Sequence, residues 1–464
     1  MGRARSTLVL LAVFIALAGY VYFVELERRP ASETPPNEQL FTWETDNLTA
    51  LTIDFGGEET TLERVDDAAW QLTAPITTAA DETQVSSITS ALASLDIRRV
   101  LSEGAGDLSP FGLDEPNVEV SVVVSGAGSP QRLLIGDTTP TGGERYAKLA
   151  ASDRVILIAS HLDTTFSKST FDLRHKTILG FEASNVTAFE IESAGDSLRF
   201  TKDQNEWRLA MPWDVRSDFS TVEGAVGRLS TGQIRSVISE GFDDTAVTDN
   251  DALASYGLAD PSVTATVRLG SATATLLIGT EAVNGAYYAK DASRSVIFTV
   301  DSTLVTDLQR APGEYRDKGL FDFRPFNASR LELARPDGTL VFERVKAEGD
   351  QTEDAWMRPG ADAPLDRSGM DDLLAKLSNL RAESFEESRA DIGLDDGNIL
   401  VTVRVAYAAS ASEDSDAAEE QVTLWRAGDE TYGIHGEEPG AARLDTRSVD
   451  DALEALVALV AEES

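Results

Sequence analysis

Apolar and polar residues alternate in three separate stretches of the chain, and these stretches can be aligned with one another. They begin at Leu40, Ile178 and Leu320. Alternation with a period of two is typical of a strand that buries one face. The aligned positions hold an aromatic residue, an asparagine, a hydroxyl residue and two apolar residues: Trp43, Phe181 and Phe323; Asn47, Asn185 and Asn327; Thr49, Thr187 and Ser329; Leu51 and Ile53, Phe189 and Ile191, Leu331 and Leu333. The pattern predicts an internal repeat with three copies.

The same order of elements follows each of these stretches. A tryptophan comes first, at Trp70, Trp207 and Trp356, and then a segment with apolar residues three and four positions apart, which predicts a helix. A Gly-Leu turn and two hairpins complete each copy. The turns are Phe111–Pro116, Tyr256–Pro261 and Ile392–Gly397. We therefore predict βββ-α-ββ-ββ-α units of the α+β class, with mainly antiparallel sheets and helices packed on one face.

The predicted units cover residues 40–178, 179–319 and 320–464. The third copy is degenerate, because Gly397 replaces the proline of the turn and Tyr432-Gly433-Ile434 replaces the Tyr-Ala-Lys of the first two copies. Its hairpin loop is predicted as a long acidic run, residues 409–420. Variation in loop length is what surface loops tolerate.

The N-terminal region contains an uncharged, mostly apolar run from Thr7 to Val24. At about 1.5 Å per residue this run reaches about 27 Å as a helix, which is enough to cross a bilayer core. We predict a cytoplasmic tail at residues 1–6, a single transmembrane helix at 7–24 and a Pro-rich linker at 25–39. Arg3 and Arg5 favour a cytoplasmic N-terminus, so that the body lies outside the cytoplasm. A signal peptide cleaved after Ala18 and a buried core helix are the alternatives.

Composition excludes several classes of function. The chain has 79 acidic and 40 basic residues, a net charge of −39, which disfavours binding to nucleic acid. It has no cysteine, so disulfides, thiolate metal sites and cysteine nucleophiles are excluded. The three histidines, His161, His175 and His435, form no metal-ligand spacing in the sequence. We predict no catalytic residue, no cofactor and no metal site.

Basic residues at matching positions are the candidate contacts. Lys148 and Lys290 each follow a Tyr-Ala pair. They are interpreted either as groups that hold an acidic ligand such as a cell-wall polymer, or as solvent-facing strand residues. An Arg-x-Lys pair recurs at each junction between units, at Arg174 and Lys176 and at Arg316 and Lys318. These four are candidates for ion pairs that clamp one unit to the next; the alternative is plain surface charge.

Other signals favour structural roles. The three aligned asparagines match a glycosylation sequon but are interpreted as turn residues. The tryptophans could be sugar platforms, yet their identical place in each copy favours the core. The acidic residues at 243–251 could hold calcium but lack the EF-hand spacing.

Three motifs occur in both of the first two copies: the turns Phe111–Pro116 and Tyr256–Pro261, the following Leu-Leu-Ile-Gly segments and the Tyr-Ala-Lys motifs. In these motifs the chain resembles the bacterial domain-of-unknown-function family numbered 4340. The resemblance covers Leu40 to Glu462 and is clearest in the first two copies. It implies an envelope protein, often encoded beside components of gliding-motility-type ABC transporters. It implies no catalytic residue.

These observations predict a non-enzymatic protein of the bacterial cytoplasmic membrane, anchored by residues 7–24, with its body in the periplasm or at the cell surface. The predicted role is an accessory or assembly component of an ABC-transporter-linked or surface-organelle complex. A periplasmic module that binds a ligand or glycan is the alternative, and a hydrolase is a distant third.

Overall fold

The computed structural model describes residues 38–65, 69–104, 106–240, 252–346, 354–361, 363–394, 398–408 and 417–461. By its internal contacts the chain divides into two units, Met1–Lys176 and Thr177–Ser464. The first contains one copy of the repeat and the second contains two. The predicted tail and anchor, and the predicted linker as far as residue 37, lie outside the described residues. The last two residues of that linker, Glu38 and Gln39, form a short strand. Among the helices in the described ranges, none has the length and apolar character needed to cross a bilayer.

The first unit is built on a sheet of nine described strands, in the order β5-β4-β3-β2-β8-β9-β10-β11-β7. Every pairing in it is antiparallel. A short pair, β1 (Glu38–Gln39) with β6 (Asp96–Ile97), lies beside it. The elements are β2 (Leu48–Phe55), β3 (Glu58–Arg64), β4 (Trp70–Ala74), β5 (Thr78–Ala79), α2 (Glu82–Ala93), β7 (Arg99–Ser102), β8 (Val118–Val124), β9 (Gln131–Thr138), β10 (Glu144–Leu149), β11 (Val155–Ala159), α3 (Leu162–Phe166) and α4 (Thr170–Leu173).

The second unit contains two sheets, of nine and eight described strands, whose order is the same except that the third repeat has no described counterpart of β15. One runs β15-β14-β13-β12-β17-β18-β19-β20-β16, and the other runs β23-β22-β21-β25-β26-β27-β28-β24. The elements of the second repeat are β12 (Ala188–Ser193), β13 (Asp196–Asp203), β14 (Glu206–Met211), β15 (Val215–Arg216), α5 (Phe219–Thr231), β16 (Ser236–Glu240), β17 (Val263–Leu269), β18 (Ala272–Glu281), β19 (Ala286–Asp291), β20 (Val296–Asp301) and α7 (Ser302–Leu308). Those of the third are β21 (Ala328–Arg335), β22 (Gly338–Val345), β23 (Ala355–Met357), α8 (Arg367–Ser378), β24 (Ala382–Glu386), β25 (Ile399–Ala408), β26 (Ala417–Ala427), β27 (Glu430–His435), β28 (Ala441–Leu444) and α9 (Thr446–Ala461).

The antiparallel α+β units are confirmed, with short strands that the sequence pattern does not predict: β5 and β15 before the helix of the first two repeats, and one strand after the helix of every repeat. After the long helix of each repeat, a short strand (β7, β16 or β24) pairs with the last strand at the far edge of the sheet. The helix therefore carries the chain from one edge of the sheet to the other. These strands have four or five residues each, which is too short for a clear periodic signal.

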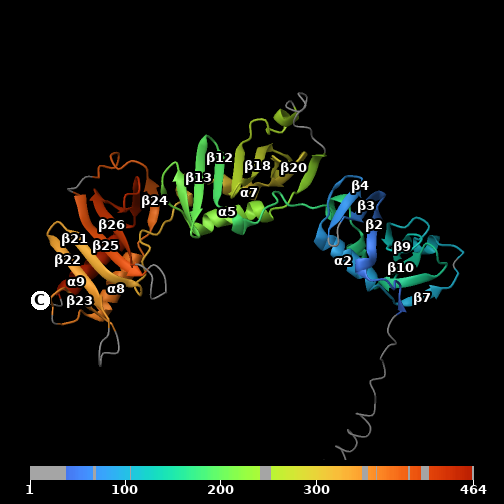
Figure 1. Cartoon of the computed structure of the whole chain (residues 1–464), viewed down its shortest axis with the longest axis horizontal. Coiled ribbons are helices and arrows are strands. Elements are labelled where there is room, and N and C mark those ends of the chain that lie inside the picture. Colours follow the sequence, from blue (N-terminus) through green and yellow to red (C-terminus); the bar gives the residue numbers. More distant parts are fainter. Residues whose placement is uncertain are drawn as a thin grey trace, which may run out of the picture. The chain divides into compact units, whose positions relative to one another are not determined.

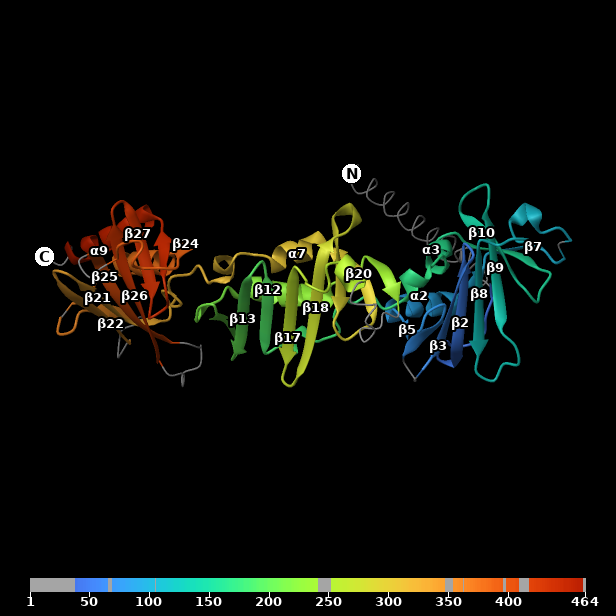
Figure 2. The same ribbon diagram turned by 90° about the horizontal axis from the view of Figure 1, so that it is seen from above.

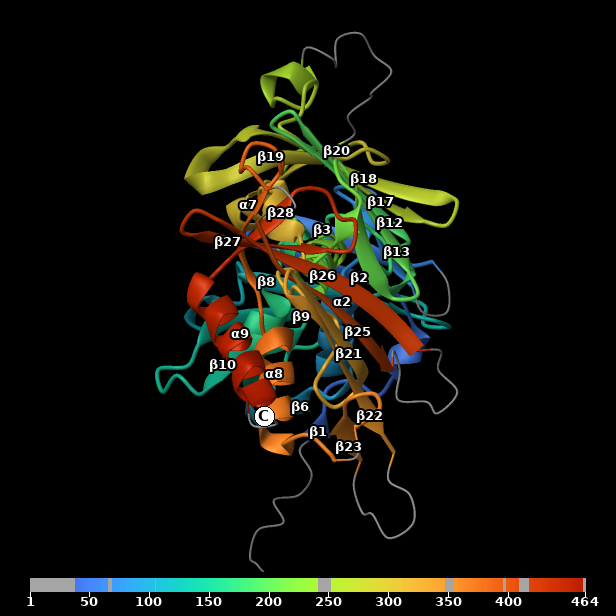
Figure 3. The same ribbon diagram turned by 90° about the vertical axis from the view of Figure 1, so that its left-hand side faces the viewer.

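The helices cover one face of each sheet. In the second repeat α5 and α7 lie on the same side of the strands (Figure 1), and β13, β12, β17 and β18 run side by side (Figure 2). In the third repeat α8 and α9 pack next to each other (Figure 3). The alternating positions of the sequence face this layer, because neighbouring residues on a strand point to opposite faces. Phe189, Phe323 and Met370 are fully buried there.

The Gly-Leu turn covers the opposite face. In the second repeat, Leu258 and Tyr256 of this turn pack on Leu277 and Ile297 of the sheet. The rings of Tyr256 and Tyr288 are 4.8 Å apart, and in the first repeat those of Phe111 and Tyr146 are 5.1 Å apart. The turn therefore gives each sheet a second, smaller apolar layer.

The acidic hairpin loop of the third repeat is shorter than predicted. The prediction placed residues 409–420 in the loop, but β26 begins at Ala417 and pairs with β25. Glu420 is a buried strand residue, 6% exposed. Its carboxylate accepts hydrogen bonds from the backbone N–H groups of Asp322 and Phe323, both at 2.9 Å, which explains why a charged residue lies inside the sheet.

The first turn of α5 provides a test of pH dependence. Asp218 caps this helix by accepting the backbone N–H of Thr221 at 2.8 Å. Burial alone would raise the pKa of Asp218, but hydrogen bonds from Ser220 and Thr221 outweigh it and the pKa is lowered. Asp218→Ala is expected to cost about 1 kcal/mol of stability at neutral pH. A lowered carboxyl pKa stabilises the fold above the unfolded value of about 3.9, and this contribution is lost as the pH falls through the folded pKa.

The difference in the free energy of unfolding between wild type and Asp218→Ala should therefore shrink as the pH is lowered from about 4. Urea unfolding at several pH values, read out by circular dichroism, measures it. Asp218→Asn is the matched control, because asparagine also caps a helix but does not titrate. An unchanged difference at low pH would contradict the assignment.

Candidate functional site: the charged junction of the second unit

An extended segment at residues 316–319, here called the connecting strand, joins the second and third repeats within the second unit through isolated β-bridges. Its first residue, Arg316, forms a β-bridge with Ser217, and the amide of Asp317 donates to the carbonyl of Arg216 at 3.0 Å. Two residues later the same strand pairs with the third repeat. The amide of Ala382 donates to the carbonyl of Lys318 at 2.8 Å, and Gly319 forms a bridge with Arg381. The backbone of this strand is therefore hydrogen-bonded to both repeats.

Arg216, at the end of β15, bonds to two carboxylates of the third repeat and to one carbonyl of the connecting strand. Its Nε donates to Glu438 Oε1 at 3.1 Å and its Nη1 donates to Asp322 Oδ1 at 2.6 Å. Its Nη2 donates to the carbonyl of Gly319 at 3.0 Å. The side chain is 15% exposed, as is that of Glu438. Charge-assisted hydrogen bonds between such buried groups fix the position of one repeat relative to the other.

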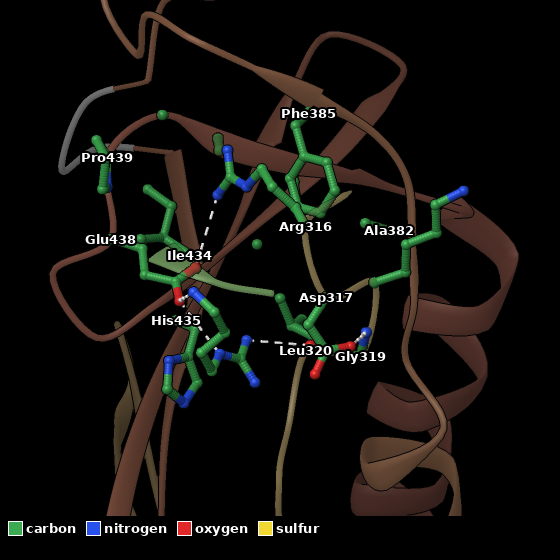
Figure 4. Close-up of a pocket in the computed structure, with 16 residues that line it drawn as sticks. Arg316, Asp317, Gly319, Leu320, Ala382, Phe385, Ile434, His435, Glu438 and Pro439 are labelled. Carbon is green, nitrogen blue, oxygen red and sulfur yellow. Dashed lines mark hydrogen bonds and ion pairs between the residues drawn. The ribbon is translucent and has the colours of Figure 1, made fainter. Parts of the chain in front are cut away.

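Arg316 approaches the same carboxylate from the other side. Its Nη2 lies 3.6 Å from Glu438 Oε2, and its guanidinium stacks on Phe385, 4.0 Å from the ring centre. The ring of Trp213 is 5.9 Å away. Figure 4 shows Arg316 and Phe385 beside Glu438. Glu438 is therefore held between two arginines, one of which rests on an aromatic ring.

The two arginines differ in their electrostatic balance. Burial would lower the pKa of Arg216, but the carboxylates of Asp322, Glu438 and Asp317 outweigh it and the pKa is raised. For Arg316 burial dominates, and the nearby positive charge of Arg216 adds to it, so the pKa is lowered although Glu438 opposes this. Arginine stays protonated in both cases. Arg216 therefore makes the more favourable ionic contact across the junction.

A second group of ionisable side chains lies next to this junction. Asp322, Glu420 and His435 each have a ligand-type atom within 4.8 Å of the others. His435 Nε2 is 3.3 Å from Glu420 Oε2 and 3.8 Å from Asp322 Oδ2. The phenol of Tyr407 has a pKa raised to about 12 by burial and by the carboxylates of Glu420 and Asp322. The third repeat therefore concentrates negative charge at its entry.

The junction itself is closed to ligands. The cavity lined by Arg216, Arg316, His435 and Glu438 has a volume of ≈ 10 Å³ (Figure 4), about the space of one water molecule. A larger hollow of ≈ 540 Å³ lies elsewhere in the third repeat, between Phe326, Arg344, Trp356 and Arg367. That size suits a small ligand. The exposed ring of Phe326, 77% exposed, has no aromatic counterpart in the first two repeats, which have Asp46 and Ser184 there.

The matched lysines are buried, so their interpretation as solvent-facing residues is wrong. Lys148 is 9% exposed and Lys290 is 2% exposed. Lys290 pairs across the sheet with Leu277 and Ile297, which lie under the Gly-Leu turn. The turn thus covers the lysine, which no sequence period could indicate. In the third repeat Ile434 replaces the lysine of the Tyr-Ala-Lys motif. It packs in the apolar layer under the Gly-Leu turn.

The two Arg-x-Lys pairs proposed as contacts between units do not share one kind of environment. Lys176 Nζ donates to the carbonyl of Asp172 at 2.8 Å and lies 3.6 Å from Asp81 Oδ2, within its own unit. Arg174 is 4% exposed and forms a β-bridge with Ala80. Of the second pair, Arg316 contacts Glu438 as described, whereas Lys318 is exposed and takes part through its backbone.

Sequence reasoning missed Arg216 and Glu438. Arg216 occupies a position where the first repeat has Ala79, so the repeat alignment gave it no weight. Glu438 is one of 79 acidic residues and follows a strand in an ordinary turn. The two are 222 positions apart, and no local signal joins them.

The comparisons with known proteins identify a family without an assigned activity. A family model described as Domain of unknown function (DUF4340) matches residues 70–211 and 207–397. No curated protein matches the sequence. A crystal structure of a DNA polymerase sliding clamp from Pseudomonas aeruginosa with ligand is similar at 9% identity, with 88% of this chain and 93% of that chain covered. Its TM-score is 0.14, which is too low to carry an argument on fold or function.

Proposed function

This chain belongs to the DUF4340 family, and from that premise we propose that it is a non-enzymatic accessory component of a membrane complex in the bacterial envelope. Residues 7–24 anchor it in the cytoplasmic membrane, and its repeats extend outside the cytoplasm. There they assemble with the subunits of an ABC-transporter-linked or surface-organelle complex.

The observation that carries the proposal is the use of buried charge at the junction. Two repeats are joined by ion pairs of Arg216 and Arg316 with Glu438. The cavity between these side chains holds no more than one water molecule. An enzyme aims perturbed ionisable groups at a space where a substrate fits. Here such groups stabilise the position of one repeat against the next, as an assembly component requires.

The anchor supports the same proposal. A single apolar run, preceded by Arg3 and Arg5 and followed by a Pro-rich segment, is a simple way to present a large acidic body beside a membrane protein. A surface with a net charge of −39 is repelled by anionic lipid headgroups. The repeats would therefore stand away from the bilayer and contact other proteins.

Isolation of the complex from native membranes tests the proposal. The tagged full-length chain, crosslinked in its membranes and solubilised in detergent, is expected to copurify with integral membrane subunits of one complex. The control is a variant in which a cleavable secretion signal replaces residues 7–24. It should reach the same compartment, leave the membrane fraction and lose those subunits. Recovery of the full-length chain alone would contradict the proposal.

The hollow between Phe326 and Trp356 favours a second candidate function, the binding of a small ligand or glycan. Its volume of ≈ 540 Å³ and its mixture of aromatic and charged side chains suit such a ligand. Retention of polysaccharide by the full-length chain, with loss in Phe326→Ala, would favour this candidate over the assembly role.

A further inference from the structure

We propose that Asp322, Glu420 and His435 bind one divalent transition-metal ion of the zinc class. The three residues come from different elements of the third repeat. Asp322 lies in the segment that enters the repeat, Glu420 is in β26, and His435 ends β27. Backbone pairing fixes two of them, because Val422, two residues after Glu420, pairs with His435.

The distances fit a common ion. His435 Nε2 lies 3.3 Å from Glu420 Oε2 and 3.8 Å from Asp322 Oδ2, and all three ligand atoms are within 4.8 Å of one another. Ligand atoms held about 2.1 Å from a tetrahedral zinc ion are about 3.4 Å apart. Small side-chain rotations therefore suffice to bring the three atoms around one centre, with a fourth position left for water.

The carboxylates are already oriented by other groups. Glu420 accepts the backbone N–H groups of Asp322 and Phe323, so its side chain is fixed on both oxygens. Asp322 Oδ1 accepts from Arg216, and Oδ2 faces His435. Hydrogen bonds of this kind around metal ligands hold them in place and raise their affinity.

The electrostatics favour a cation at this point. The side chain of Glu420 is only 3% exposed, and that of His435 is 18% exposed. Glu420 interacts with two backbone amides and the imidazole, and the carboxylate of Asp322 lies close to it. A buried carboxylate beside a second carboxylate is costly without a compensating positive charge. Arg216 supplies part of that charge from the far side of Asp322, and an ion between the three ligands would supply the rest.

The ligand set is a feature of the third repeat alone. At the position of Asp322 the first two repeats have Thr42 and Gly180, and at that of His435 they have Leu149 and Asp291. Both of those repeats fold into the same sheet without the three residues. The sheet therefore forms without this set of three, although Glu420 also binds the entering segment and Asp322 also pairs with Arg216.

The donor set selects the class of metal. Calcium and magnesium prefer oxygen ligands only, whereas an imidazole with two carboxylates suits zinc and its first-row neighbours. Asp322 also pairs with Arg216, so a single side chain would contact both the ion and the junction between the repeats.

Zinc binding by the full-length chain in detergent tests the proposal. Equilibrium dialysis against zinc chloride, with excess magnesium to occupy exposed carboxylates, should leave one zinc per chain. His435→Asn and Asp322→Asn are each expected to weaken this binding about 100-fold or more. His161→Asn, which removes an exposed histidine of the first unit, should bind zinc as wild type does. Zinc should also raise the unfolding temperature of the wild type and of His161→Asn, and should raise that of His435→Asn and Asp322→Asn much less.

Two results would overturn the proposal. One is a wild-type chain that holds no more zinc than His435→Asn, while circular dichroism shows both to be folded. The other is equal loss of zinc in His161→Asn, which would assign the binding to scattered surface groups. Manganese in place of zinc, with the same dependence on His435, would retain the site and change only its preferred ion.

Discussion

Replacing Arg216 with methionine is expected to weaken the connection between the second and third repeats by about 3 kcal/mol. The substitution leaves Glu438, which is 15% exposed, with one fewer cation, and it removes the charge-assisted bond to Asp322. Removal of one partner from a buried ion pair costs about 3–5 kcal/mol, and the partial exposure here favours the lower value. Methionine keeps an unbranched apolar stem and removes the guanidinium with its charge and its hydrogen bonds.

Hydrogen exchange of the connecting strand measures this effect. The amides of Asp317 and Ala382 are bonded to the carbonyls of Arg216 and Lys318. If their exchange reports opening of the junction, a loss of about 3 kcal/mol accelerates it about 100-fold. Arg208→Met is the matched control, because Arg208 pairs with Asp214 at the surface, with side chains 46% and 74% exposed. That pair should contribute less than about 1 kcal/mol.

The partner carboxylate provides a second test of the same junction. Glu438→Gln should also weaken the connection, but it should make the further change Arg216→Met much less damaging, since the uncompensated charge is then absent. Residues in one ionic network are expected to be non-additive in this way. If Arg216→Met behaves like Arg208→Met, or if the effects of Arg216→Met and Glu438→Gln simply add, the ionic account of the junction is wrong.

Gly136→Ala is expected to destabilise the first unit by about 2–3 kcal/mol. A Cβ atom at Gly136 would lie 2.1 Å from the carbonyl oxygen of Phe111, a backbone atom that cannot move aside alone. Overpacking of this kind costs about 1–3 kcal/mol. The midpoint of thermal unfolding, followed by circular dichroism, should fall by about 5–10 °C.

A neighbouring glycine is the control for chain flexibility. Gly143 has an ordinary backbone conformation, and a Cβ there would meet nothing within 4 Å. Gly143→Ala should therefore change the midpoint little or raise it slightly. Gly279→Ala should repeat the effect in the second repeat, where the Cβ would lie 2.0 Å from the carbonyl oxygen of Tyr256. Equal behaviour of Gly136→Ala and Gly143→Ala would show that the close approach does not limit stability.

These contacts give the repeated motifs a physical meaning. The glycine that ends each Leu-Leu-Ile-Gly segment lies under the backbone of the Gly-Leu turn, and Gly112 and Gly257 in that turn have φ angles of +64° and +69°. A turn can approach a strand this closely only if neither residue has a side chain. In the third repeat a Cβ at Gly393 would meet nothing within 4 Å. The divergence of that copy in sequence therefore accompanies a looser turn.

The sequence alone was sufficient for the longer local elements of this protein, but not for short strands such as β7, β16 and β24. Alternating residues such as Phe189 and Ile191 indicate a strand because side chains on a strand point to opposite faces. The spacing of Val222, Val226 and Leu229 indicates a helix for the equivalent reason. Repetition of these patterns identified three units with the same order of elements, since each copy must bury the same kind of face.

Tertiary structure alone decided which distant groups meet. Arg216 and Glu438 are 222 positions apart, and Asp322 and Glu420 are 98 apart. Lys290 looks like an exposed strand residue until the turn at Tyr256 covers it. Local patterns report the face on which a residue lies, but the partner on that face is set by how sheet edges and connecting strands come together in space. The charged junction and the proposed metal ligands depend on that arrangement, so no periodicity in the chain could reveal them.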